Sequence, residues 1–199
     1  MVYLKTTPYT NASACLINIL EILNKNYKGS QEEEFKIWLK TSLLPTRASS
    51  IYGLAIIAKQ EGLNPKIFVE GEDFDFPDYR FYRYKKSDIE YAQISSEIYK
   101  EKCKEKNIPI HVTQVSLEKI KDLLKTNYLM VRINTKQIRD LKKNSSNYIV
   151  FESYKNKLFT IIDPTKGRLE VNEDTIYESY ISLETKKHRL HKILCIEKK

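Results

Sequence analysis

Apolar residues recur at helical spacing in some segments of the chain and form short strand-like runs in others. The first helical pattern covers residues 12–23. Ser30 and Glu33 have the spacing of a capping box, and Ser49 or Ser50 precedes a further helical pattern that Gly62 ends. The helices predicted in this way cover residues 12–23, 30–39, 48–63, 87–106, 116–126 and 172–181.

Strand patterns dominate the second half of the chain. Strands are predicted at residues 65–70, 108–115, 128–134, 147–154, 157–164, 168–171 and 191–198. Residues 73–88, with Pro77, have no clear period and indicate an irregular loop. The order of elements predicts an α+β fold with a helical N-terminal half and a mainly antiparallel sheet in the C-terminal half. No low-complexity linker interrupts the pattern, so we expect one domain over residues 1–199.

Composition narrows the protein class. With 199 residues, 41% of them hydrophobic, the chain is long enough to bury a core. The apolar stretch near the N-terminus is broken by Asn18 and Glu21 and has no basic leader, which predicts a cytoplasmic protein with neither signal peptide nor membrane partner. Three widely spaced cysteines indicate reduced thiols. Scarce glycine with plentiful Lys, Ile, Glu and Tyr is typical of thermophiles.

The formal charge of +8 favours anionic partners such as nucleic acid. Many lysines alternate with glutamates, as in residues 97–107, and this pattern is typical of a solvated helix face. In residues 74–86, aromatic and basic residues alternate; they either contact unpaired bases and phosphates or, as we favour, pin a long loop onto the domain. The candidate basic contacts are Arg80, Arg83, Lys85, Lys86, Lys136, Arg139, Lys142 and Lys143, extended by Lys186, Lys187 and Arg189.

The opening segment "LKTTPYTNASACLINIL" resembles the start of the C39-like, bacteriocin-processing group of papain-like cysteine peptidases. Its motif is approximately Gln-Thr-x-x-Tyr-Thr-Cys-Gly-Pro-Ala-Ser-Leu. The residues that match are Thr6, Thr7, Pro8, Tyr9, Thr10, Ala14 and Leu16. Residues 50–70, 111–134 and 147–168 resemble later segments of the same family, so the similarity covers almost the whole chain.

In that family a glutamine stabilises the oxyanion, a cysteine attacks, a histidine acts as base and an aspartate before proline orients the histidine. The resemblance puts Lys5, Asn11, Asn147 and Asp163 at these positions, so only the aspartate is kept. An amide is neither nucleophile nor base, and loss of a triad nucleophile costs about a millionfold in rate. The resemblance therefore implies the fold without its usual reaction, and we expect Asn11, Asn147 and Asp163 to lie together.

Other candidate centres have ordinary structural explanations. Cys15 lies one helical turn after Asn11, but no histidine is placed to activate it, so a buried core thiol is favoured over a relocated nucleophile. His188 and His191 are three positions apart in a segment that we expect to be extended, which predicts solvated side chains and no metal site. His111 enters a strand edge. No motif for a cofactor is present.

Three functions remain open, in this order. The first is a catalytically inactive papain-like domain that binds a peptide or protein in the inherited cleft. The second is a basic module that binds RNA, DNA or a ribonucleoprotein. The third is a cysteine peptidase or acyl transferase with Cys15 as the relocated nucleophile.

Overall fold

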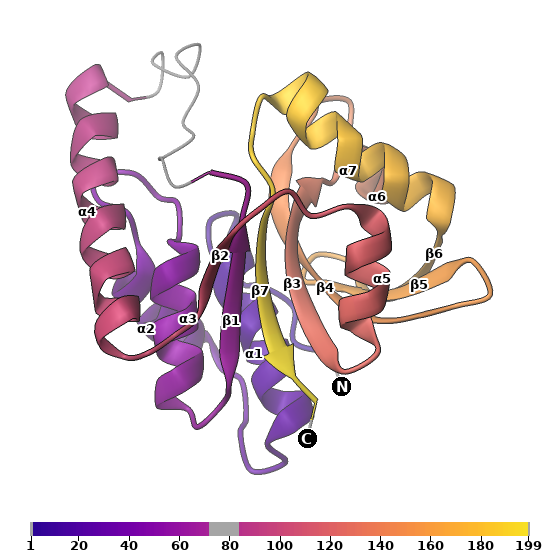
Figure 1. Ribbon diagram of the computed structural model, residues 1–199, viewed down its shortest axis with the longest axis horizontal. Coiled ribbons are helices and arrows are strands. Elements are labelled where there is room, and N and C mark those ends of the chain that lie inside the picture. The colour runs from indigo at the N-terminus through magenta and orange to yellow at the C-terminus, as the bar shows by residue number, and fades with distance from the viewer. Residues whose placement is uncertain (1, 72–83, 199) are drawn as a thin grey trace.

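The computed structural model describes residues 2–71 and 84–198, which form one twisted sheet with helices on both faces (Figure 1). The strands are β1 (Pro65–Val69), β2 (Ile110–Val112), β3 (Asn127–Asn134), β4 (Ser146–Lys155), β5 (Leu158–Asp163), β6 (Gly167–Asn172) and β7 (Lys192–Glu197). Their order across the sheet is β2-β1-β7-β3-β4-β5-β6. Among these strands only β1 and β2 pair in parallel, and every other pair is antiparallel.

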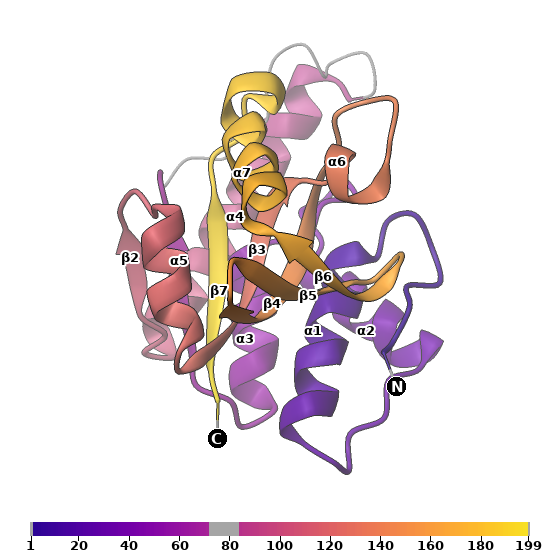
Figure 2. The same cartoon turned by 90° about the vertical axis from the view of Figure 1, so that its right-hand side faces the viewer.

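The helices cover the two faces of the sheet unequally. They are α1 (Asn11–Leu23), α2 (Gln31–Thr41), α3 (Ile51–Gln60), α4 (Lys86–Glu105), α5 (Leu117–Leu124), α6 (Lys136–Arg139) and α7 (Glu173–Lys187). Helices α1 and α3 pack on one face, with α2 and α4 outside them, and α5 and α7 pack on the other (Figures 1 and 2). The predicted α+β class, with helices first and a mostly antiparallel sheet after them, is confirmed.

The strands divide their side chains between two cores. On β3, Met130 packs with α1 and α3, whereas its neighbours Leu129 and Val131 pack with α5 and α7. Successive side chains of a strand point to opposite faces, so a strand covered on both faces is apolar at nearly every position. This packing places the N-terminus of α1 beside the start of β4.

Several predicted boundaries are confirmed at the level of side-chain caps. Ser30, Ser50 and Ser116 each accept a hydrogen bond from the backbone N–H three residues later, at 3.2, 3.3 and 3.2 Å. Gly62, at φ +77°, turns the chain after α3 in a conformation that glycine adopts without strain.

Three boundaries were predicted wrongly. Helix α4 begins before Ser87, because the Asp88 carboxylate accepts a hydrogen bond from the Lys85 N–H (2.8 Å) and so caps the helix. Helix α7 continues to Lys187, well beyond the predicted end at residue 181. Strand β2 is shorter than predicted, and α6 was missed because four residues carry no periodic signal.

No helix within residues 2–71 and 84–198 combines the length and hydropathy that crossing a bilayer requires. The three cysteines are free and buried.

Candidate functional site

A buried carboxylate holds the chain that leads into α1. Glu34 on α2 is fully buried, and it accepts hydrogen bonds from the Thr6 N–H (3.0 Å) and the Tyr3 hydroxyl (2.8 Å). It also accepts one from the hydroxyl of Thr10, the residue immediately before α1. A carboxylate with several donors fixes both itself and the donors. Sequence reasoning missed Glu34 because it lies in a run of three glutamates at the start of an amphipathic helix.

Asn11 and Asn147 face one cleft. The Asn11 Oδ1 accepts a hydrogen bond from the Tyr148 N–H (2.9 Å), while its Nδ2 is buried and has no hydrogen-bond partner in the described residues. The Asn147 Nδ2 donates to Ser145 Oγ (2.8 Å) and Thr135 Oγ1 (3.3 Å). Both asparagines line a cavity of about 170 Å³, which we call the cleft. Its walls include Asn11, Arg47, Ser49, Arg132, Asn147 and Arg189.

Asp163, at the end of β5, is bound to a different partner. Its carboxylate is fully buried and forms a bidentate ion pair with the Arg139 guanidinium, at 2.7 and 2.8 Å, while Oδ1 also accepts from the Thr165 N–H (2.8 Å). The structure therefore brings Asn11 and Asn147 to one cleft, whereas the Asp163 carboxylate is occupied by Arg139, a residue on the unpredicted helix α6.

Lys5 joins this buried polar region through its backbone. Its N–H donates to the Pro164 carbonyl oxygen (2.9 Å), which ties the N-terminal segment to the end of β5. Burial, and then the nearby charge of Arg139, lower the pKa of the Lys5 ammonium. The position that the resemblance assigns to the oxyanion-stabilising glutamine thus carries a partly desolvated amine.

A comparison with known families assigns the whole chain. The Peptidase_C39 like family (DUF3335) matches over residues 1–199. The chain belongs to this family. Among solved structures, a double-glycine-motif protease from an AMS/PCAT transporter, in complex with its leader peptide, is similar over 99% of this chain and 91% of that chain, with 13% identity and a TM-score of 0.50. At this identity the similarity shows the fold alone. No curated protein matches the chain.

Cys15 is a core thiol in this C39-like fold. It is fully buried, and its Sγ donates to the Tyr148 carbonyl oxygen (3.3 Å). Burial raises the pKa of the Cys15 thiol well above its usual range. The thiolate is the nucleophilic form, so this position disfavours attack on a substrate. None of the residues that line the cleft in the described chain is a cysteine or a histidine.

The prediction that both C-terminal histidines are solvated was wrong for His191. The segment is not extended throughout: His188, with φ +50°, ends α7, and His191 immediately precedes β7. The His191 ring is buried, stacks on Tyr180 with 3.6 Å between ring centroids, and pairs with the Glu70 carboxylate through Nδ1 (2.8 Å). In residues 2–71 and 84–198 no three His, Cys, Asp or Glu side chains form a metal-binding group.

The Glu70 carboxylate should make the stability of the fold depend on pH in the acidic range. Burial alone would raise its pKa, but hydrogen bonds from the His191 ring and backbone outweigh burial and hold the pKa below its usual value. Because this pKa is lower in the folded state, the ionised carboxylate stabilises the fold at pH values above the unfolded-state pKa of about 4.3. The contribution is lost as the pH falls through the folded-state pKa. Between about pH 5 and pH 3, urea denaturation should show a steeper loss of stability for the wild type than for Glu70→Gln. Equal slopes would contradict this prediction.

Among the candidate basic residues that the structure describes, those at the start of α4 lie apart from those at α6 (Figure 1). Arg80 and Arg83 lie outside the described residues. Lys85 and Lys86 are exposed at the start of α4, and Lys136, Lys142 and Lys143 lie on or after α6. Figure 1 draws α4 and α6 on opposite sides of the sheet. Two further positions are not surface cations: Lys187 is buried, and the Arg139 guanidinium is committed to Asp163.

Sequence reasoning missed the arginines of the cleft. Arg47 lies between α2 and α3, and Arg132 lies on β3; neither belongs to a basic run or a motif. Arg189 was considered only as part of a basic surface. No local signal identifies Arg47 and Arg132, because only the packing of distant segments brings them to Asn11.

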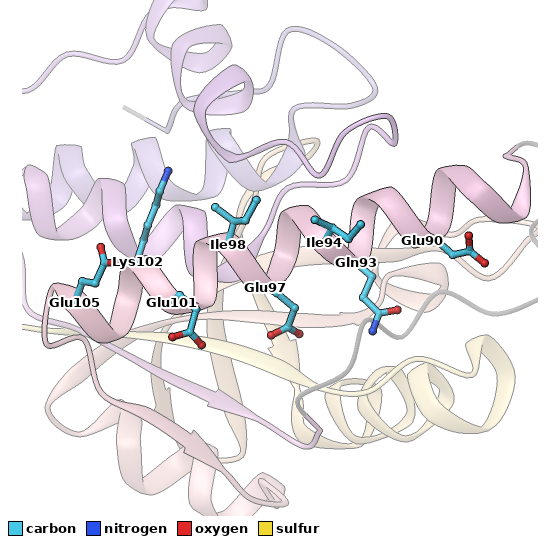
Figure 3. A pocket seen from close by; sticks show the side chains of 8 residues that line it. All are labelled: Glu90, Gln93, Ile94, Glu97, Ile98, Glu101, Lys102 and Glu105. Atoms are coloured by element: carbon cyan, nitrogen blue, oxygen red, sulfur yellow. The ribbon is translucent and has the colours of Figure 1, made fainter.

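A larger hollow of about 620 Å³ lies along the outer face of α4. Figure 3 shows Ile94 and Ile98 projecting to one side of the helix, while Glu97 and Glu101 project to the other. This hollow has two exposed apolar side chains and several carboxylates but no nucleophile or base of the cysteine-peptidase type. It is larger than the cleft, yet Asn11 and Asn147, two of the positions that the family resemblance singles out, line the cleft and not this hollow.

Proposed function

We propose that this protein is a catalytically inactive member of its family that binds a peptide or a protein segment in the cleft beside α1. The observation that carries the proposal is the pair Asn11 and Asn147, which lie in the cleft at the positions that the resemblance assigns to the nucleophile and the base. An amide side chain donates and accepts hydrogen bonds but neither attacks a carbonyl nor takes up a proton at neutral pH.

The position of Asp163 supports inactivity independently. In a cysteine-histidine-aspartate arrangement the carboxylate orients the imidazole. Here both oxygens of Asp163 are bound to Arg139, at 2.7 and 2.8 Å, and Asn147 donates instead to Ser145 and Thr135. The carboxylate therefore has a structural partner in place of a catalytic one.

Peptide binding is supported by the family and by the place of the cleft. The protease of similar fold was solved with its leader peptide, so this scaffold can hold a peptide while keeping its architecture. In this chain the N-terminus of α1 and the start of β4 still form the two walls of a polar cleft. A binding function needs these walls and not the nucleophile.

The two alternatives have less support. A relocated nucleophile at Cys15 would need a thiolate, but burial raises the pKa of this thiol well above its usual range. A continuous nucleic-acid surface would need the basic residues of α4 and α6 together, and these helices lie on opposite sides of the sheet (Figure 1). Affinity for RNA that falls steeply with salt would favour the second alternative over peptide binding.

The catalytic part of the proposal predicts no peptide hydrolysis. A fluorogenic peptide that carries a double-glycine motif, incubated with purified protein under reducing conditions, should be cleaved no faster than in buffer, because no activated nucleophile faces the cleft. Iodoacetamide treatment of the folded protein should leave Cys15 unmodified, as mass spectrometry can check. Cleavage that disappears in Cys15→Ala would contradict the proposal and establish the relocated nucleophile.

A further inference from the structure

Helix α4 turns large apolar side chains away from the core. Ile94 and Ile98 are 57% and 51% exposed, and Tyr91, one turn earlier, is 58% exposed. A surface helix of a globular protein normally directs its large apolar side chains inward. The fully buried positions of α4 instead carry small or polar residues, namely Ala92, Ser96, Lys100 and Cys103. The outer face of α4 thus presents apolar surface that the core does not use.

The three exposed apolar side chains form one stripe. Residues 91, 94 and 98 are three and four positions apart, and this spacing places them on successive turns of the same helix face. Figure 3 shows Ile94 and Ile98 projecting to the same side of α4. Single exposed apolar residues are ordinary on protein surfaces, whereas contiguous apolar patches are typical of interaction sites. The stripe therefore indicates a contact with another molecule.

A row of carboxylates accompanies this stripe. The row lines the hollow along α4 and consists of Glu90, Glu97, Glu101 and Glu105. Their spacing of seven, four and four residues keeps them on one side of the helix. In Figure 3, Glu97 and Glu101 project to the side opposite the isoleucines. The described wall of the hollow also contains one lysine, Lys102, so acidic side chains predominate there.

Lysines of the same helix pair with two of these glutamates. The Lys104 Nζ lies 2.7 Å from Glu101 Oε1, and the Lys100 Nζ lies 3.8 Å from Glu97 Oε2. Both side chains of the first pair are more than half exposed, and exposed ion pairs are weak. A cation from a partner therefore needs no unpaired carboxylate, because it competes only with a weak contact.

We propose that the outer face of α4 binds a basic amphipathic helix of a partner protein. The apolar side of that helix packs on Tyr91, Ile94 and Ile98, and its lysines or arginines contact the adjacent glutamates. A helix laid along an apolar surface, with anchors at i, i+3 or i+4 and i+7, is a recurrent mode of recognition. Residues 90–105 span roughly 22 Å at 1.5 Å per residue, which matches about four turns of a partner helix.

The sign of the charge selects the class of partner. The chain as a whole has a formal charge of +8 and attracts anions at long range. The carboxylates beside the stripe have the opposite sign, so they repel nucleic acid and anionic membrane surfaces at close range and attract a basic segment. This inference does not rest on the proposed peptide-binding function, since the described linings of the cleft and of the hollow share no residue.

The test uses two synthetic helical peptides that differ only in charge. Each has about 18 residues, long enough to form a helix, with leucines along one face. The flanking positions are lysine in one peptide and glutamate in the other. Fluorescence anisotropy with the full chain should show the lysine peptide binding about tenfold more tightly at about 0.15 M salt, with a smaller ratio at about 1 M. The net charge of the chain alone predicts the reverse order.

Variants of α4 locate the contact. Ile94→Ser combined with Ile98→Ser should weaken binding of the lysine peptide about tenfold, because it removes two apolar anchors. Neither isoleucine belongs to the described core, so the variant should stay folded, as circular dichroism can check. Glu97→Gln combined with Glu101→Gln should abolish the preference for lysine over glutamate. The matched controls are Ile181→Ser and Glu178→Gln, at exposed positions of α7, and they should change neither property.

Each other outcome overturns this inference and leaves the proposed function in place. Such outcomes are equal binding of the two peptides, affinity that the α4 variants leave unchanged, or no binding of either peptide. A wild-type dimer that Ile94→Ser converts to a monomer in size-exclusion chromatography would assign the face to a second copy of the chain. Binding gained only when a Gly-Ser linker replaces residues 72–83 would assign it to the chain itself.

Discussion

Asp163→Ala should lower the free energy of unfolding by about 3–5 kcal/mol, because it leaves the Arg139 guanidinium buried without its counter-charge. The two side chains are 0% and 7% exposed, and two N–H···O contacts at 2.7 and 2.8 Å join them. In a chain of this length each kcal/mol lowers the melting temperature by about 2–4 °C. Urea denaturation and calorimetry should therefore both detect the change. Arg139→Ala should cost a similar amount.

The double variant distinguishes a buried ion pair from two independent contributions. Asp163→Ala combined with Arg139→Ala removes both charges, so its cost should be clearly smaller than the sum of the single costs. Some loss should remain, since Asp163 also accepts a hydrogen bond from the Thr165 N–H. Lys142→Ala, at an exposed position beyond α6, is the matched control and should change stability little. Additive single costs would show that the pair does not act as a unit.

Glu34→Ala should lower the free energy of unfolding by about 3 kcal/mol. It would remove the carboxylate that accepts from the Tyr3 and Thr10 hydroxyls and from the Thr6 N–H. Thr10 is fully buried, whereas the contacts of Tyr3 and Thr6 are partly buried, so we expect the cost of one or two unsatisfied buried groups, at about 1–3 kcal/mol each. These donors belong to the segment that leads to Asn11. Hydrogen exchange of residues 3–10 should therefore increase more than exchange of β3.

Neighbouring glutamates provide the control for this substitution. Glu32 is exposed at the start of the same helix and pairs with Lys36 on the surface (2.8 Å). Glu32→Ala should leave the free energy of unfolding nearly unchanged, as is usual for an exposed ion pair. Equal effects of the two substitutions would contradict the role assigned to Glu34. If Glu34→Ala loses peptide affinity while Glu32→Ala keeps it, the segment before α1 also supports the cleft.

The success of the fold prediction has a local cause. Serine caps at Ser30, Ser50 and Ser116 act within three residues, so the signal and the structure that it produces are adjacent in the sequence. Strands such as β3 are covered on both faces and appear as continuous apolar runs. The errors occur where local signals are weak. Helix α6 has only four residues and so shows no apolar period. The end of α7 was missed because its last turns are mostly polar and extend beyond the apolar pattern.

In the candidate site, too, local features could be predicted from the sequence and distant contacts could not. The sequence by itself supplied the resemblance that assigns Asn11 and Asn147 to the positions of nucleophile and base, because a motif records residue type and order. Only the tertiary structure decided that Asp163 is bound to Arg139, that Glu34 holds the entry to α1 and that His191 is buried against Glu70. These partners are 24, 28 and 121 residues apart. No local pattern specifies such contacts, since the packing of helices on the sheet selects one partner among many equivalent charges.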